Sequence, residues 1–295
     1  MSEIKINAIS ETSFGLSEGP HWNEDDQTFI FVDIVNGNIH RYFLQTQRVQ
    51  NAHLEDIGTG STVSFIIPVE GAQDIFVISV GTSIALIKWS PTEPENQTKK
   101  PILLLSLNAK EAQHVQFNDA KCDTKGRLYI GTTIKDIEKV FEENLGSLYS
   151  IDSDVKISGL VSNDNRYFLF LSANRRPAFE YKSHAEVRGF PDGMCIDEND
   201  NLWVACYEGS QILNIDPKEG KLLRILHMPV RNITSCCWGG PDYSTLFVTS
   251  AGMGHEKETE LYPDTGKIFT VTGLGVKGLP PKKYKINNIS KFVRS

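Results

Sequence analysis

The sequence predicts an all-β fold, a six-bladed β-propeller, and two observations support this prediction. A short polar turn followed by alternating aliphatic or aromatic residues recurs along the chain, as in DDQTFIFVDI from Asp25, TKGRLYIGTT from Thr124 and ENDNLWVACY from Glu198. Such alternation is typical of a half-buried antiparallel strand. Several of these segments are followed by a second turn and strand, as in GNIHRY from Gly37 and SQILNID from Ser210. Strands repeated at a period of roughly 40–50 residues indicate a propeller, and this length leaves room for six blades.

The remaining elements follow in chain order from the same pattern. Further strand segments begin at Asp74, Thr82, Gly146, Asn163, Asp242 and Gly266. Only residues 107–112 and 135–143 could form a turn or two of helix. After the segment from Asn163 the chain runs into ANRRPAFEYK without a second turn and strand, so one blade, around residues 157–181, is expected to be shortened. We expect one propeller domain over residues 1–295.

Charge and cysteine content exclude several classes of protein. The chain has 30 Lys and Arg against 37 Asp and Glu, which argues against binding to nucleic acid or to an anionic membrane. The N-terminus does not resemble a signal peptide, and no apolar run approaches the ~18 residues of a spanning helix. The five cysteines form no CxxC pair, and the vicinal pair Cys236 and Cys237 in TSCCWGG is interpreted as buried packing. We therefore expect a cytoplasmic protein that is a monomer or a weak dimer.

Three short motifs carry polar residues that differ from ordinary surface charges. Glu18 lies in LSEGPHW, Asn118 and Asp119 in VQFNDAK, and Asp192 in GFPDGM. Each directly precedes a predicted strand and could lie at the inner mouth of the propeller. Carboxylate and amide oxygens from different blades suit a hard cation such as Ca²⁺. The alternative, that these are turn residues that cap their own backbone, remains equally open.

A fourth motif has the ligand spacing of an EF-hand loop. Asp197, Asn199 and Asn201 alternate, and Glu208 stands at the twelfth position. Leu202, however, occupies the position that requires glycine, and a strand follows instead of a helix. We interpret this motif as a polar hairpin turn.

These motifs resemble the family of senescence marker protein (regucalcin), gluconolactonase and the insect luciferin-regenerating enzyme. The similar segments are LSEGPHWNEDDQTFIFVDI, QFNDAKCDTKGRLYIGTT, FPDGMCIDENDNLWVACYEG, TSCCWGG and VTGLGVKG. The resemblance implies a six-bladed propeller with a divalent metal on its axis, held by a Glu, an Asn and an Asp. By this resemblance Glu18 and Asp192 bind the metal, Asn118 contacts the substrate, and Asp192 is the candidate catalytic general base. Ca²⁺ is the first choice of metal, with Zn²⁺, Mn²⁺ and Mg²⁺ as alternatives.

The chain departs from the family pattern at two places. Gln116 stands where the family usually has an Arg that holds the polar substrate. The third metal ligand belongs in an SNGL-W-S motif, and the corresponding residues 157–162 read ISGLVS, without the Asn or the Trp. We expect a weakened metal site in which Ser158, Asn163 or a water substitutes, and a strand from Ala178 could fill the place of the missing one.

The function expected from this resemblance is hydrolysis of a sugar lactone or a similar cyclic ester by a metal-dependent enzyme. Two alternatives remain open. One is a calcium-binding regulatory propeller with little or no catalysis, which the departures at Gln116 and in residues 157–162 favour. The other is an activity of the insect luciferin-regenerating type at the same metal site.

Overall fold

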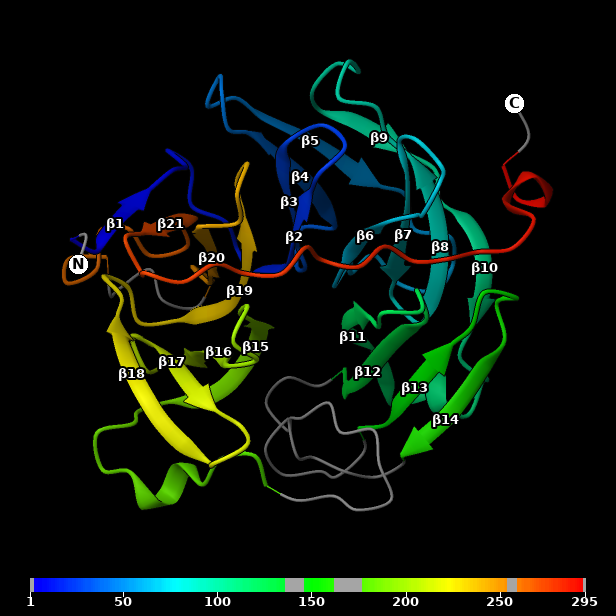
Figure 1. The fold of residues 1–295 in the computed structure, drawn as a ribbon. Helices are drawn as coiled ribbons and strands as arrows, with labels where there is room; N and C mark the ends of the chain where they lie inside the picture. The colour runs from blue at the N-terminus through cyan, green and yellow to red at the C-terminus, as the bar shows by residue number, and fades with distance from the viewer. Residues whose placement is uncertain (1–2, 136–145, 162–176, 254–258, 294–295) are drawn as a thin grey trace. The chain divides into compact units, whose positions relative to one another are not determined.

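The computed structural model describes residues 3–135, 146–161, 177–253 and 259–293. These residues form five β-sheets, four with four strands and one with five (Figure 1). The first sheet contains β2 (Ser17–Asn23), β3 (Thr28–Asp33), β4 (Asn38–Phe43), β5 (Val49–Leu54) and β9 (Gln97–Lys99). The second contains β6 (Ile66–Pro68), β7 (Ile75–Val80), β8 (Ser83–Lys88) and β10 (Ile102–Ser106). The third contains β11 (Val115–Cys122), β12 (Leu128–Ile134), β13 (Leu148–Ile151) and β14 (Ile157–Val161).

The last two sheets complete the described fold. The fourth contains β15 (Phe190–Ile196), β16 (Leu202–Tyr207), β17 (Gln211–Asp216) and β18 (Lys221–His227). The fifth contains β19 (Ile233–Gly239), β20 (Thr245–Ser250), β21 (Phe269–Thr272) and β1 (Lys5–Ala8). The N-terminal strand β1 therefore completes a sheet made otherwise of C-terminal strands, with Lys5 opposite Thr272. Three 3₁₀ turns accompany the strands, at Glu111–Gln113, Tyr181–Ser183 and Ile289–Lys291.

The prediction of an all-β propeller is confirmed, but the prediction of six blades is wrong, because the residues that the structure describes form five. Residues 157–161, expected at the shortened blade, form β14, the outer strand of the third sheet. The strand segment expected from Asn163 lies outside the described residues. Residues 177–189 form a 3₁₀ turn and loop, so no strand begins at Ala178. The length estimate failed because the stretch between β14 and β15 contributes no sheet to the described fold.

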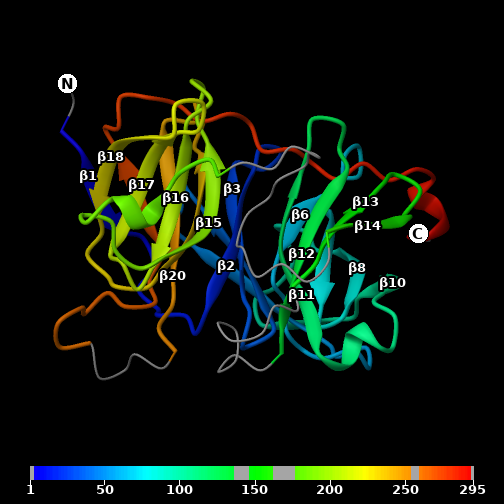
Figure 2. The same cartoon turned by 90° about the horizontal axis from the view of Figure 1, so that it is seen from below.

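The described part of that stretch covers a neighbouring sheet. Phe179, Tyr181 and Val187 pack against a cluster made by the fourth sheet, which includes Val204 and Leu213. The ribbon of this segment runs alongside β16 and β17 (Figure 2). The ring of Phe179 also stacks on His184 at 4.6 Å between centroids. Apolar side chains in this segment are therefore partly buried against β16 and β17, although the segment lacks the alternation of a strand.

The polar turns expected between strands are confirmed, and aspartate side chains cap several of them. Oδ1 of Asp123 accepts hydrogen bonds from the N–H groups two and four residues later, and Asp152 and Asp197 do the same. Oδ2 of Asp197 also accepts from Trp203 Nε1 at 2.9 Å. Because its carboxylate is engaged within its own hairpin, the interpretation of the EF-hand-like motif as a turn is confirmed.

The chain divides into two compact units. Unit 1 comprises residues 1–33, 42–49 and 170–280, and unit 2 comprises residues 34–41, 50–169 and 281–295. The fourth and fifth sheets belong to unit 1, and the second and third to unit 2. The single domain expected over residues 1–295 stays a prediction.

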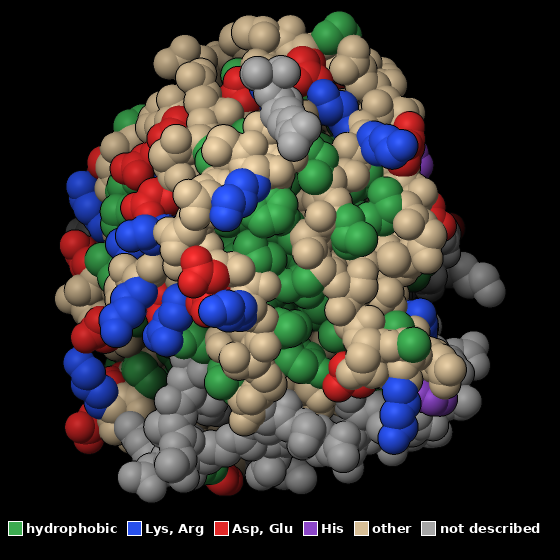
Figure 3. Space-filling view, turned by 90° about the vertical axis from the view of Figure 1, so that its right-hand side faces the viewer, with side chains coloured by type: hydrophobic (Ala, Val, Ile, Leu, Met, Phe, Trp, Pro, Cys, Tyr) green, Lys and Arg blue, Asp and Glu red, His purple; other side chains and the backbone are tan. Residues whose placement is uncertain are grey.

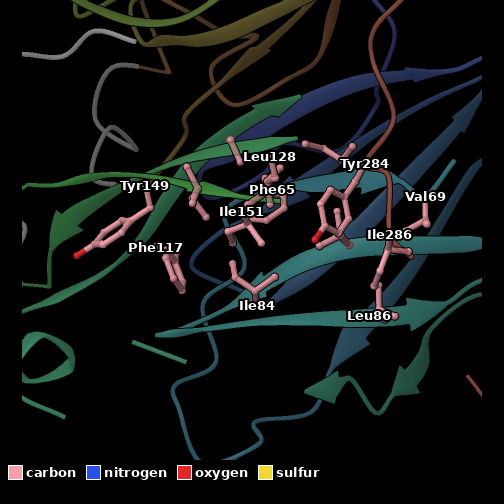
Figure 4. Packing of buried hydrophobic residues seen from close by; sticks show 14 of the residues in the cluster. Phe65, Val69, Ile84, Leu86, Phe117, Leu128, Tyr149, Ile151, Tyr284 and Ile286 are labelled. Atoms are coloured by element: carbon pink, nitrogen blue, oxygen red, sulfur yellow. The ribbon is translucent and has the colours of Figure 1, made fainter. Parts of the chain in front are cut away.

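The core of unit 2 includes a segment from the C-terminus of the chain. Phe65, Phe117 and Leu128 are fully or almost fully buried together with Tyr284, whose exposed fraction is 0% (Figure 4). Tyr284 forms a bridge with Val69, and its hydroxyl donates to the carbonyl of Asp152 at 2.8 Å. The hydrophobic core of the second and third sheets thus includes residues that follow these sheets by more than 120 positions in the sequence.

The outer strands of unit 2 present apolar side chains to solvent. Figure 3 shows hydrophobic side chains on the face that carries the outer strands, and the exposed large residues of β10 and β14 are Ile102, Leu103, Ile157 and Leu160. Both strands are sheet edges, so their backbone groups can pair with an added strand.

No helix in the described ranges is long and apolar enough to cross a membrane.

Candidate functional site

In unit 1, the two carboxylates expected to bind metal lie on the inner strands β2 and β15. Glu18 is the second residue of β2, and Asp192 is the third residue of β15. Both strands contact β19, the inner strand of the fifth sheet. The structure therefore places Glu18 and Asp192 at corresponding ends of strands that share a neighbour.

A β-bulge accompanies each of these carboxylates. Two residues of β2, Gly19 and Pro20, lie between the pairs that Glu18 and His21 make with β3. In β15 the pairing breaks in the same way between Pro191 and Met194, which places Asp192 in the bulge. Bulges reorient side chains and are common next to active sites. The left-handed φ of +55° at Gly19 fits the glycine of the SEGP motif.

Glu18 is a buried acid with an exposed fraction of only 8%. The N–H of Gly19 donates to its Oε2 at 3.0 Å. A buried carboxylate is costly unless hydrogen bonds or a cation compensate its charge. This environment fits a ligand for a hard cation.

Asp192 is half-buried, and its charge acts on a neighbouring thiol. Burial raises the pKa of Cys206 to about 12, and the negative charge of Asp192 adds to this rise. Cys206 pairs with Pro191 across β15 and β16, so the Asp192 carboxylate lies close to the fully buried Cys206. The Cys206 thiol therefore stays protonated and does not compete with the carboxylate as an anion.

Sequence reasoning missed a group of polar residues on and beside β19. The hydroxyl oxygens of Ser17 and Ser235 and both side-chain amide atoms of Asn232 are buried without a hydrogen-bond partner in the described part of the protein. Thr234, in the bulge of β19, donates to the carbonyl of Ser17 at 2.6 Å. Buried polar atoms of this kind are usually satisfied by ordered water or by a ligand. Their only signal in the sequence is the polar run NITS, which immediately precedes the Cys236–Cys237 pair that is interpreted as buried packing.

In unit 2, the residues expected to contact substrate lie on β11. Asn118 and Asp119 occupy a bulge between Phe117 and Ala120, the same feature that surrounds Asp192. The carboxylate of Asp119 accepts from the N–H of Ala120 at 2.7 Å, so it caps its own backbone. The carbonyl of Asn118 accepts from Ser64 Oγ at 2.7 Å, which fixes the backbone beside its side chain.

Gln116 is held by a residue that the sequence did not single out. The hydroxyl of Thr62 donates to Gln116 Oε1 at 3.2 Å. With this oxygen engaged, the two N–H groups of the Gln116 amide are left for another acceptor. The Gln116 amide is therefore an oriented, neutral hydrogen-bond donor.

Of the two residues expected to substitute for the third metal ligand, the structure describes only Ser158. Ser158 is exposed on β14, the outer edge of its sheet, and β12 and β13 separate it from β11. Asn163 lies outside the described residues. The described residues also contain no cluster of three or more His, Cys, Asp or Glu side chains suited to a metal. The protein carboxylates at the candidate site are thus Glu18 and Asp192.

The chain matches one family model over residues 16–165 and 171–252, that of the SMP-30/Gluconolactonase/LRE-like region. It belongs to this family. Regucalcin of Danio rerio is 32% identical over 96% of this chain and 99% of its own. The solved structure of a luciferin-regenerating enzyme is 30% identical, with a TM-score of 0.84, and the match covers 96% of this chain and 100% of that chain. The structure of regucalcin from Agrobacterium tumefaciens, described as a calcium-binding protein, is 20% identical, with a TM-score of 0.77. That match covers 95% of this chain and 97% of the other. Family membership supports a lactonase-type or regucalcin-type function.

Proposed function

We propose that the protein hydrolyses a sugar lactone or similar cyclic ester with the help of a divalent cation. The observation that carries this proposal is the placement of Glu18 and Asp192 at bulges of β2 and β15, two inner strands that both contact β19. Their oxygen donors suit Ca²⁺ first, with Zn²⁺, Mn²⁺ or Mg²⁺ as alternatives. Family membership supports a hydrolase, and the two carboxylates supply its ligands.

The residues have distinct roles in this proposal. A divalent cation held by Glu18 and Asp192 would polarise an ester carbonyl and lower the pKa of a bound water. Asp192 takes the proton of the attacking water and returns it to the leaving oxygen. Asn118 and Gln116 donate hydrogen bonds to substrate oxygens. Opening of the ring gives a hydroxy acid as the product.

The test is release of acid from gluconolactone while Ca²⁺, Zn²⁺, Mn²⁺ or EDTA is varied. We expect turnover that depends on the metal, that EDTA removes, and that is lost in Glu18→Gln because one anionic ligand is gone. Asp192→Asn should reduce turnover by roughly 10²-fold or more because it removes the base. Glu70→Gln is the matched control, since Glu70 is exposed on a turn. Normal turnover by Asp192→Asn would remove its catalytic role.

Binding of the metal is measured separately by isothermal titration. We expect weak binding that is reduced in Glu18→Gln and unchanged in Glu70→Gln. Absence of heat at millimolar Ca²⁺ or Zn²⁺ would contradict the metal site.

A second function, calcium binding without useful catalysis, is favoured by one observation. Residues 157–161, where the family pattern places the third ligand, contain no Asn and form the outer strand β14, so Glu18 and Asp192 are the two expected ligands that the sequence retains. Metal binding in the titration, together with no acid release by folded protein, would favour this alternative. It would also overturn the proposed hydrolase.

A further inference from the structure

Two cysteines on neighbouring inner strands of unit 1 face each other. Sγ of Cys195 on β15 and Sγ of Cys236 on β19 are 3.6 Å apart, although the residues are 41 positions apart in sequence. A disulfide bond is about 2.05 Å long, so the two sulfurs need to approach by about 1.5 Å. This distance is within the reach of small side-chain rotations.

The two strands are unusually close beside this pair. A Cβ on Gly193 would lie 2.0 Å from Ser235 Oγ and 2.9 Å from Ser235 Cα, so only glycine fits there. Gly193 and Ser235 precede Cys195 and Cys236 by two residues and one residue. The backbone geometry therefore holds the two thiols together in the reduced protein.

Hydrogen bonding favours one arrangement of the thiol protons. Cys236 Sγ donates to the carbonyl of Trp203 at 3.3 Å, so its sulfur is free to accept from Cys195. Cys236 is fully buried, and Cys195 is only partly buried. A small oxidant from solvent would therefore meet Cys195 first.

The other cysteines are placed differently. Cys237 packs with Trp22 and Phe247 in a separate hydrophobic cluster, whereas Cys195 and Cys236 share the cluster that contains Trp203 and Trp238. Cys206 directs its thiol to the carbonyl of Val204, and Cys122 lies in unit 2. The vicinal pair is thus divided between two cores.

We propose that Cys195 and Cys236 form a peroxide-sensitive thiol pair that closes a reversible disulfide between β15 and β19. The Cys195 thiol releases its proton, and the thiolate attacks one peroxide oxygen. The O–O bond breaks, the leaving hydroxide takes up a proton, and one sulfenic acid and one water result. The Cys236 sulfur then attacks the sulfenic sulfur and displaces a second water. Two thiols and one hydrogen peroxide thus yield one disulfide and two waters, and a dithiol reductant reverses the change.

The cross-link would act on the element that carries Asp192. Asp192 lies three residues before Cys195 on β15, so the disulfide ties this strand to β19. Closing a loop of this length should raise the Tm by roughly 5 °C or more. This effect does not depend on the proposed hydrolysis.

The experiment treats the folded, reduced protein with hydrogen peroxide, quenches it, and then denatures and alkylates it. We expect the count of free thiols to fall from the five of the reduced chain to three, and dithiothreitol to restore it. Cleavage at aspartate separates Cys195 from Cys206, so mass spectrometry of the wild-type peptides identifies the β15 partner. Cys236 and Cys237 are adjacent and stay in one peptide, so the cysteine variants determine which of the two forms the cross-link on β19.

The variants give opposite expectations. Cys195→Ala and Cys236→Ala should each abolish the cross-link and the rise in Tm, while Cys237→Ser and Cys206→Ala should keep both. A cross-link that persists in Cys236→Ala, or that joins Cys206 in the wild type, would overturn the proposal. Oxidation of Cys195 to sulfinic acid, with four free thiols left and no cross-linked peptide, would also overturn the proposal.

Discussion

At the scale of single residues, the hydrogen bond from Thr62 to Gln116 determines how the Gln116 amide is presented. Thr62→Val removes the donor, and the amide then loses its fixed orientation. A neutral hydrogen bond contributes about 1 kcal/mol, so we expect the KM for the lactone to rise about fivefold with kcat unchanged. Gln116→Leu should raise the KM by at least as much.

The double variant distinguishes positioning from a general loss of structure. If Thr62 acts through Gln116, adding Thr62→Val to Gln116→Leu should change the KM no further. Additive effects would show that the two residues act independently. Thermal unfolding of all three variants controls for stability.

Gly193 is a second residue whose identity is dictated by its surroundings. An alanine there would place its Cβ against the backbone of Ser235, which cannot move away without displacing β19. We expect Gly193→Ala to reduce the free energy of unfolding by about 1–3 kcal/mol and to weaken metal binding through Asp192. Gly131→Ala is the matched control, because the nearest atom to its added Cβ is 4.0 Å away. Equal unfolding midpoints for the two variants in urea would contradict this explanation.

At the scale of elements, one turn before β20 depends on a single ionised carboxylate. Hydrogen bonds from Ser244 and then Lys277 lower the pKa of Asp242 to about 2. Because the unfolded chain has the ordinary pKa of about 3.9, this turn contributes stability above pH ~4 and loses it as the pH falls toward 2. We expect the Tm difference between wild type and Asp242→Ala to be constant from pH 7 to about 5 and to shrink between about pH 4 and 2. Ser244→Ala removes the first of these hydrogen bonds, so the pH range over which the Tm difference shrinks should become smaller. An unchanged pH range would show that Ser244 does not lower the pKa of Asp242.

The strands themselves were predictable, whereas their grouping into blades was not. TFIFVD, LYIGTTI and LWVACY are rich in aromatic and β-branched residues and form β3, β12 and β16 as expected. Residue type is a local property, but the sheet to which a strand belongs depends on partners far along the chain. Residues 157–161 were assigned to a new blade for this reason, although they pair with β13.

At the candidate site, too, the sequence reveals local motifs but not the contacts between strands that are distant in sequence. The motifs around Glu18, Asn118 and Asp192 were visible because Gly, Pro and Asp concentrate at turns and bulges. The roles of Thr62 and Ser235, and the contact of Cys195 with Cys236, depend on distances between strands that no motif records. Residues of ordinary type become significant only through those distances.

At the scale of the whole molecule, both ends of the chain complete structures formed by distant segments. In unit 1, β1 adds the edge strand to β21. In unit 2, residues 284–293 return to a core that is otherwise made by residues 65–155. The backbone N–H of Tyr284 donates to the carbonyl of Pro68 and that of Lys285 to the carbonyl of Gly126, so this segment is hydrogen-bonded to strand β6 and to the turn before β12.

Tyr284 anchors this segment, since its ring is fully buried among Phe65, Ile84 and Ile151 (Figure 4). Tyr284→Ala removes the ring and leaves a cavity, so we expect a loss of about 3–5 kcal/mol in the stability of unit 2. Tyr284→Phe keeps the ring and loses only the hydrogen bond to Asp152, which should cost about 1 kcal/mol. Hydrogen exchange should show faster exchange at β7, β8 and β12 in the alanine variant, while β16, β17 and β20 of unit 1 keep their protection. Equal loss of protection in both units would mean that they unfold as one cooperative structure, and the C-terminal segment would then stabilise the entire propeller.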